Sequence, residues 1–180
     1  MNPPHLEWNP VSKEPPLLAE LRGYWQRKRG SRRLPSRRDI QPGEIRSLLP
    51  YVILVEPVEG GRDFRYRLVG SRLHDYFPVQ PTGQLMSAML APFGTGTVDA
   101  TLDAYRAVLA GDEPLRLSGD GAWFAQSPKF FEALLTPLSD DGAQADMIFG
   151  AFQFEWNHAR MPADDPSGTE RALAEALAER

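Results

Sequence analysis

Two extended segments joined by a glycine turn constrain the fold of this chain more than any other feature. Residues 51–58 are a near-continuous run of β-branched, aromatic and other apolar side chains, and residues 64–69 alternate apolar side chains with arginines. Between them, Gly60 and Gly61 supply the positive φ angles that a tight turn requires. The pattern predicts a β-hairpin, and with it an antiparallel sheet around which the rest of the chain is arranged.

Further strand and helix patterns complete the expected architecture. Three more strand candidates cover residues 115–118, 130–138 and 146–156. Apolar residues at helical spacing, with proline at the start or glycine at the end, predict helices over residues 17–29, 42–49, 98–110 and 171–179. We therefore expect an α+β fold with a five-stranded antiparallel sheet, the 98–110 helix across its concave face, and additional N-terminal and C-terminal helices.

Several short motifs, in their order and spacing, resemble those of a subfamily of small bacterial PAS proteins. The resemblance covers about residues 17–154 and rests on Tyr24-Trp25, Leu34-Pro35-Ser36-Arg37, the segment 42–50, Phe64 to Gly70, Thr82-Gly83 and Pro137 to Gly142. It implies a PAS-like sheet with helices that enclose a pocket on one face, and a role in sensing or signalling through a small ligand or a protein partner. It implies no reaction of its own.

The resemblance also divides the chain into three parts. We expect an N-terminal helical extension with a basic loop over residues 1–50, a PAS-like domain over residues 51–157, and a C-terminal linker and helix over residues 158–180. A chain of 180 residues with 42% apolar side chains can bury one sizeable core. We see no leader pattern and no apolar run of about 18 residues at the sequence level, so we expect a cytoplasmic protein without a membrane span.

Basic residues are concentrated near the amino terminus. Residues 1–38 hold nine lysines and arginines against three acids, whereas the rest of the chain holds eleven against twenty-one. The segment from Arg22 to Arg38 is therefore a candidate interface for nucleic acid or another anionic partner. The alternative, which we favour, is that this segment docks on the acidic body of its own chain; we therefore expect no nucleic-acid partner.

Catalytic and metal-binding motifs are absent from the sequence. His74 and Asp75 are candidates for acid–base chemistry, and they define an alternative function as a small-molecule enzyme. The acidic pairs Asp140-Asp141 and Asp164-Asp165 lie in turn-forming sequences, which favours a structural role. No nucleophile elbow and no zinc-binding His-Glu-x-x-His sequence occurs. We expect no enzymatic activity, no catalytic residue and no metal site.

The residue types also limit the cofactors that PAS proteins can carry. A flavin photosensor that forms a cysteinyl adduct is excluded because the chain has no cysteine. Haem is disfavoured because the 98–110 helix contains no histidine that could ligate the iron. A small organic ligand, of unknown identity, or a filled core remain as alternatives.

Aromatic residues on the sheet and on the 98–110 helix are the candidates for a ligand pocket. The expected ligand-binding residues are Tyr66, Arg67, Leu68, His74, Tyr105, Arg106, Phe131, Leu135 and Phe149. Alternation along the second hairpin strand places Arg67 opposite Tyr66, so Arg67 has the alternative of pairing with an acid on the outer surface.

The opposite face of the sheet must be covered as well. In strands 51–55 and 147–154, the side chains that point to one face of the sheet and those that point to the other are both apolar. This pattern is typical of strands that are buried on two sides. The N-terminal helix with Leu21, Tyr24 and Trp25 is the expected cover, supplied by the same chain or by a second copy. We therefore expect a homodimer and a signalling protein as partners.

Overall fold

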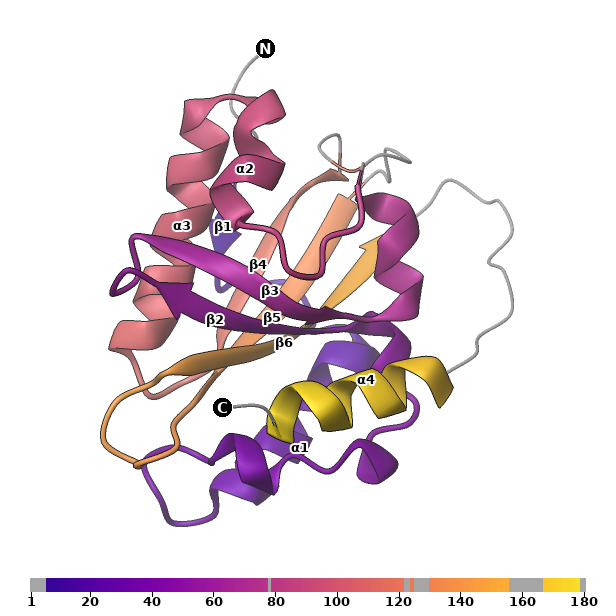
Figure 1. Ribbon diagram of the computed structural model, residues 1–180, viewed down its shortest axis with the longest axis vertical. Coiled ribbons are helices and arrows are strands. Elements are labelled where there is room, and N and C mark those ends of the chain that lie inside the picture. The colour runs from indigo at the N-terminus through magenta and orange to yellow at the C-terminus, as the bar shows by residue number, and fades with distance from the viewer. Residues whose placement is uncertain (1–5, 78, 122–123, 125–129, 156–166, 179–180) are drawn as a thin grey trace.

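A single six-stranded antiparallel sheet forms the centre of the protein (Figure 1). The computed structural model describes residues 6–77, 79–121, 124, 130–155 and 167–178. The strand order is β1-β4-β5-β6-β2-β3. The strands are β1 (Glu7–Trp8), β2 (Val52–Val58), β3 (Asp63–Val69), β4 (Leu115–Asp120), β5 (Phe130–Leu138) and β6 (Met147–Glu155). The α+β fold and the five expected strands are confirmed, and β1 is an additional strand that is too short to carry a sequence pattern.

Helices cover both faces of this sheet (Figure 1). On one face, which we call the cavity face, lie α2 (Met86–Leu90) and α3 (Thr95–Ala110); on the other, the outer face, lie α1 (Pro16–Arg29) and α4 (Ser167–Ala178). The helix expected over residues 42–49 is instead a pair of 3₁₀ turns, Pro42–Glu44 and Leu49–Tyr51. Between these two segments, residues 46–48 form a turn and not a continuous helix.

Smaller 3₁₀ segments connect these elements. They cover Arg37–Asp39, Ser71–Tyr76 and Ala91–Phe93. Within the described ranges, the helices are all too short or too polar to cross a membrane.

A β-bulge in the hairpin divides the side chains of β3 between the two faces of the sheet. Leu54 pairs with Leu68, but the next residue of β2, Val55, pairs with Tyr66, so Arg67 is an extra residue without a partner in the ladder. The extra residue reverses the alternation. Tyr66 and Val69 consequently lie in the core of the cavity face, whereas Leu68 lies in the core of the outer face.

Helix α1 buries its apolar side against the outer face of its own sheet. Leu21 and Trp25 are completely buried and Tyr24 nearly so. The indole N–H of Trp25 donates to the carbonyl oxygen of Pro137 at 2.8 Å, and the Tyr24 hydroxyl accepts from the backbone N–H of Gln41 at 2.8 Å. Helix α1 therefore covers the outer face of its own sheet through contacts made within one chain.

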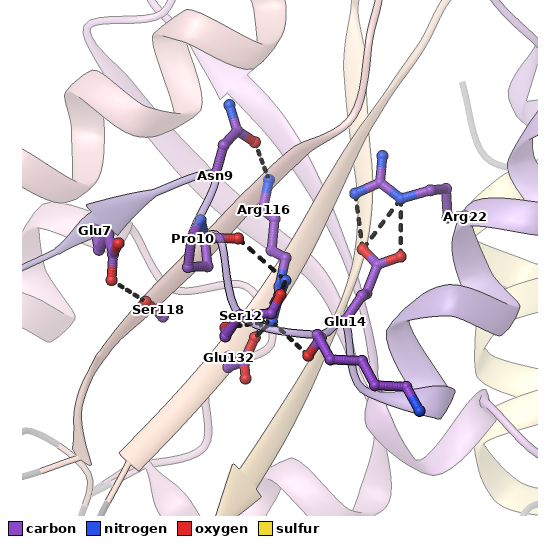
Figure 2. A network of polar contacts seen from close by, with 10 residues as sticks. Glu7, Asn9, Pro10, Ser12, Glu14, Arg22, Arg116, Ser118 and Glu132 are labelled. Carbon is purple, nitrogen blue, oxygen red and sulfur yellow. Dashed lines mark hydrogen bonds and ion pairs between the residues drawn. The ribbon is translucent and has the colours of Figure 1, made fainter.

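The segment before α1 wraps around the edge of the sheet. We call residues 6–13 the strap. Its β1 residues pair with β4, and its following residues fold over the outer face, where they contact Arg116 (Figure 2). The Arg116 guanidinium donates to the carbonyl oxygens of Pro10, Ser12 and Lys13, and its Nε donates to the Glu132 carboxylate at 2.8 Å. The strap therefore connects the cavity face to the start of α1.

Candidate functional site

An aromatic cavity lies between the cavity face of the sheet and helices α2 and α3. Its volume is about 40 Å³. Phe124 stands edge-on to Phe77 and Phe131, with ring centroids 5.9 and 5.3 Å apart, so these three rings form one corner of the wall. The described lining residues are Leu6, Tyr66, Phe77, Met89, Leu90, Phe93, Thr101, Tyr105, Leu117, Phe124, Phe131 and Phe152. None of these side chains carries a charge.

Three hydroxyl groups are the polar side-chain atoms of this described lining. The Thr101 hydroxyl is already engaged, because it donates to the carbonyl oxygen of Thr97 at 2.8 Å. The Tyr105 hydroxyl is fully buried and has no partner in hydrogen-bonding geometry. The Tyr66 hydroxyl is close enough to add a charge effect and a hydrogen-bond effect to the raised pKa of Tyr105, although the two hydroxyls do not meet in hydrogen-bonding geometry. The site therefore presents one unused hydroxyl inside an otherwise apolar wall.

Burial strongly favours the neutral form of both tyrosines. Desolvation is the largest cause of the raised pKa of Tyr66 and of the raised pKa of Tyr105. Both hydroxyls are therefore protonated at physiological pH, and each has a proton to donate as well as lone pairs to accept. An unpartnered hydroxyl in such a place costs about 1–3 kcal/mol of stability, which a bound acceptor or donor would recover.

Three of the predicted pocket residues line this cavity. Tyr66, Tyr105 and Phe131 do so, and Leu135 belongs to the same core without reaching the cavity wall. The sequence analysis missed Leu6, Phe77, Phe124 and Phe152. Leu6 and Phe124 lie in segments without a periodic pattern, so alternation gave no signal for them. Met89 and Leu90 were missed as well, since α2 has only five residues.

The structure corrects the positions of two other predicted pocket residues. Leu68 and Phe149 lie on the outer face of the sheet, in the core under α1. Leu68 is displaced by the bulge at Arg67 described above. Phe149 pairs with Leu54, while its neighbour Ile148 has the position on the cavity face. Because β6 carries apolar side chains on both of its faces, the alternation of apolar and polar residues could not decide which residue faces the cavity.

Comparison with known protein families agrees with this architecture. The family model of the PAS domain matches residues 13–153, which is more than half of the chain. The chain belongs to the PAS domain family. Searches among curated proteins and among solved structures returned no match. PAS domains are generally sensory or signalling modules and are typically not catalytic.

The polar residues expected in the pocket of this PAS domain have other partners. Arg67 forms an ion pair with Glu56 at 3.8 Å, which is the outer-surface alternative predicted for it. Arg106 donates to the carbonyl oxygens of Gly61 and Arg62, at 2.8 and 2.9 Å. These bonds connect the hairpin turn to α3. They also use the guanidinium group of Arg106, which would otherwise be available to bind an acidic ligand.

His74 also has a structural partner. A ring nitrogen, Nε2, lies 2.9 Å from the carbonyl oxygen of Val69, so this nitrogen carries the proton and donates it. Asp75 forms no ion pair with it in the part of the chain that the structure describes. The two residues are adjacent in sequence but do not form the relay that the enzymatic alternative would need.

The basic segment of the PAS domain is largely neutralised by the chain's own acids. Six of its eight cations form ion pairs within the chain, at N–O distances between 2.6 and 3.5 Å. The pairs are Arg22–Glu14, Lys28–Glu44, Arg29–Glu113, Arg32–Asp39, Arg33–Asp112 and Arg37–Asp140. This arrangement favours the expectation that the segment docks on its own chain, and it leaves Arg27 and Arg38 as the cations without an ion pair among the described residues.

The described lining of the cavity lacks the side chains that most often bind metal ions and haem iron. The described lining contains neither histidine nor carboxylate. No group of three or more metal-ligating side chains occurs within the residues that the structure describes. The chemistry that the cavity supports is therefore binding of an uncharged molecule by apolar contact and one or two hydrogen bonds.

Proposed function

We propose that this PAS domain is a sensory module whose signal is a small uncharged molecule held in the aromatic cavity. The observation that carries the proposal is the buried Tyr105 hydroxyl, which lies in an apolar wall without a partner. Buried polar groups are nearly always hydrogen-bonded, and an exception is best explained by a missing partner. A ligand with one hydrogen-bonding atom would supply that partner.

The lining also determines the charge of the ligand. A carboxylate or an ammonium group would lose its hydration on entry, and none of the described lining side chains could compensate with an opposite charge. Neutral molecules lose much less on transfer to such a wall. The preferred ligands are therefore uncharged and mostly apolar, with a single hydroxyl, carbonyl or ring N–H.

The same lining favours binding over catalysis. It provides no carboxylate, imidazole or amine, within the described residues, that could transfer a proton to or from a bound molecule. The two tyrosine hydroxyls have raised pKa values and are weak acids in this environment. We propose that the module acts by binding its ligand and passing the change to a protein partner.

Two measurements test the proposed function. Native mass spectrometry beside the denatured mass shows whether a small molecule is carried through purification. Titration with phenol, benzene and benzoate, followed by NMR, then compares ligands of similar shape. We expect phenol to bind at least tenfold more tightly than benzoate, because the carboxylate cannot be compensated.

The variant Tyr105→Phe tests the role of the hydroxyl. We expect it to lose the preference for phenol over benzene by about fivefold, the value of one neutral hydrogen bond. Tyr24→Phe removes a buried hydroxyl on the outer face and is the matched control. Equal binding of benzoate and phenol, or an unchanged phenol preference in Tyr105→Phe, would contradict the proposal.

The expected homodimer is a separate prediction. Leu21, Tyr24 and Trp25 are buried on their own sheet, so a dimer that uses these residues must exchange α1 between two copies. Sedimentation velocity at tens of micromolar distinguishes a monomer from a dimer. A monomer at that concentration would contradict the prediction.

A further inference from the structure

The cavity as it stands is too small for the ligands that its chemistry favours. A volume of about 40 Å³ holds about three water molecules at ~10–15 Å³ each. A benzene molecule, in comparison, occupies an apolar cavity of roughly 150 Å³. Part of the wall must therefore move before an aromatic molecule can enter.

The walls differ in how firmly they are held. Six of the twelve described lining residues come from β3, β4, β5, β6 and α3, which belong to the central sheet and to a helix of 16 residues. The other six lie in short segments, and among these Leu6 lies at the start of the strap, next to a strand of only two residues. Both residues of β1 are exposed, so little apolar burial holds this end in place.

The two ends of the strap are attached very differently (Figure 2). Residues 10–13 are held by the guanidinium of Arg116, which donates to three of their carbonyl oxygens and to the Ser12 hydroxyl. The other end has the short β1–β4 ladder, the pair of bonds between Asn9 and the backbone of Arg116, at 2.7 and 3.1 Å, and a long hydrogen bond of 3.4 Å from the Ser118 hydroxyl to the Glu7 carboxylate. Asn9 adopts a positive φ of 50°, which marks the corner between the two parts.

We propose that Leu6 is a removable wall of the cavity, and that ligand entry replaces it. This inference rests on the proposed function. The uncharged ligand takes the space of the Leu6 side chain, residues 6–9 leave the edge of β4, and Arg116 keeps residues 10–13 in place. The family match begins at Lys13, so the moving part lies before the region that this chain shares with the PAS family model.

Release of the strap would change the surface of the protein when a ligand occupies the cavity. It uncovers the backbone of β4 at Leu117 and Ser118, the two residues that β1 pairs with. An uncovered strand edge is a site where another chain can add a strand. The strap thus links the buried cavity to a strand edge that a partner protein can bind.

The test uses phenol as the probe and the full chain with two single substitutions. Leu6→Ala removes the wall and is expected to raise phenol affinity about tenfold, because no leucine side chain has to be displaced. Val11→Ala is the matched control, since Val11 lies on the same strap with its side chain fully exposed. We expect Val11→Ala to bind phenol as the parent chain does.

Hydrogen exchange followed by NMR reports on the strap itself. Saturation with phenol should speed exchange of the Asn9 and Arg116 amides at least tenfold, while the Arg116 Nε–H signal persists because the Glu132 contact stays. Amides of the β5–β6 ladder serve as the internal control. Phenol binding with unchanged Asn9 exchange and equal affinity in Leu6→Ala would overturn this inference and leave the proposed function standing. Failure of phenol to bind either protein would overturn both.

Discussion

Arg116 and Glu132 form an ion pair on the outer face of the sheet, where the Arg116 side chain is only 6% exposed and that of Glu132 15%. The pair lies on neighbouring strands, β4 and β5, and the strap closes over it (Figure 2). The guanidinium also satisfies backbone carbonyl oxygens of the strap, so its charge is compensated in several directions. One buried side chain thereby joins the sheet, the strap and the start of α1.

Removal of Arg116 should therefore destabilise the protein strongly. Arg116→Met leaves the Glu132 carboxylate buried without its partner and several strap carbonyls without donors. We expect a loss of about 3–5 kcal/mol in the free energy of unfolding, measured by urea denaturation. Asp103→Asn breaks the exposed pair with Arg106 and should cost less than about 1 kcal/mol. Similar losses in the two variants would contradict the anchoring role of Arg116.

Tyr105→Phe should have the opposite effect on stability in the absence of ligand. The hydroxyl is hydrated in the unfolded chain but has no partner in the folded one, so its removal should raise the free energy of unfolding by about 1 kcal/mol. Tyr24→Phe should lower it by a similar amount, because the Tyr24 hydroxyl accepts from Gln41. Urea denaturation of both variants checks the two signs. A loss of stability in Tyr105→Phe would mean that its hydroxyl has a partner in solution.

The sequence predicted the sheet well because its strands carry strong local signals. The glycine turn, the apolar runs and the proline and glycine positions at helix ends are all properties of short segments. The residues that line the cavity depend on more than that. A single extra residue, Arg67, transfers Leu68 from one face to the other, and nothing in the alternating pattern of residues 64–69 indicates the bulge.

Long-range contacts account for the other differences. Phe149 and Ile148 are equally apolar, and only their pairing with β2 decides which one faces α3. Leu6 reaches the cavity because Arg116 and β4, more than 100 positions away, hold the strap. Neither relationship is encoded within one window of sequence, which explains why Tyr66, Tyr105 and Phe131 could be predicted as pocket residues and Leu6 could not.

Glycine is required at the end of the hairpin because the chain passes very close to itself there. A Cβ atom on Gly70 would lie 2.4 Å from the backbone carbonyl oxygen of Pro50, which cannot move independently of the main chain. Gly70→Ala should therefore lower the free energy of unfolding by more than about 2 kcal/mol. Gly23→Ala, in the middle of α1, meets only the flexible Arg27 side chain at 3.4 Å and should stabilise by about 0.5–1 kcal/mol. Urea denaturation that gave the same sign for both would contradict the close approach at Gly70.

Tyr24 should make the stability of the protein sensitive to alkaline pH. Burial raises the pKa of Tyr24 from 10 to about 12, and the hydrogen bond from Gln41 opposes this rise only in part. The unfolded chain loses the proton near pH 10 while the folded chain keeps it, so the contribution is complete below pH 10 and is lost as the pH rises through about 12.

A comparison of wild type with Tyr24→Phe isolates this residue, because other titrating groups are common to both. The stability difference between the two proteins, measured by urea denaturation, should change by about 1 kcal/mol between pH 8 and pH 11, to the disadvantage of the wild type. At pH 8 the wild type is the more stable of the two, because it keeps the Gln41 hydrogen bond. A difference that stayed constant across this interval would show that the Tyr24 hydroxyl ionises as easily in the folded protein as in the unfolded chain, and that α1 does not shield it from water.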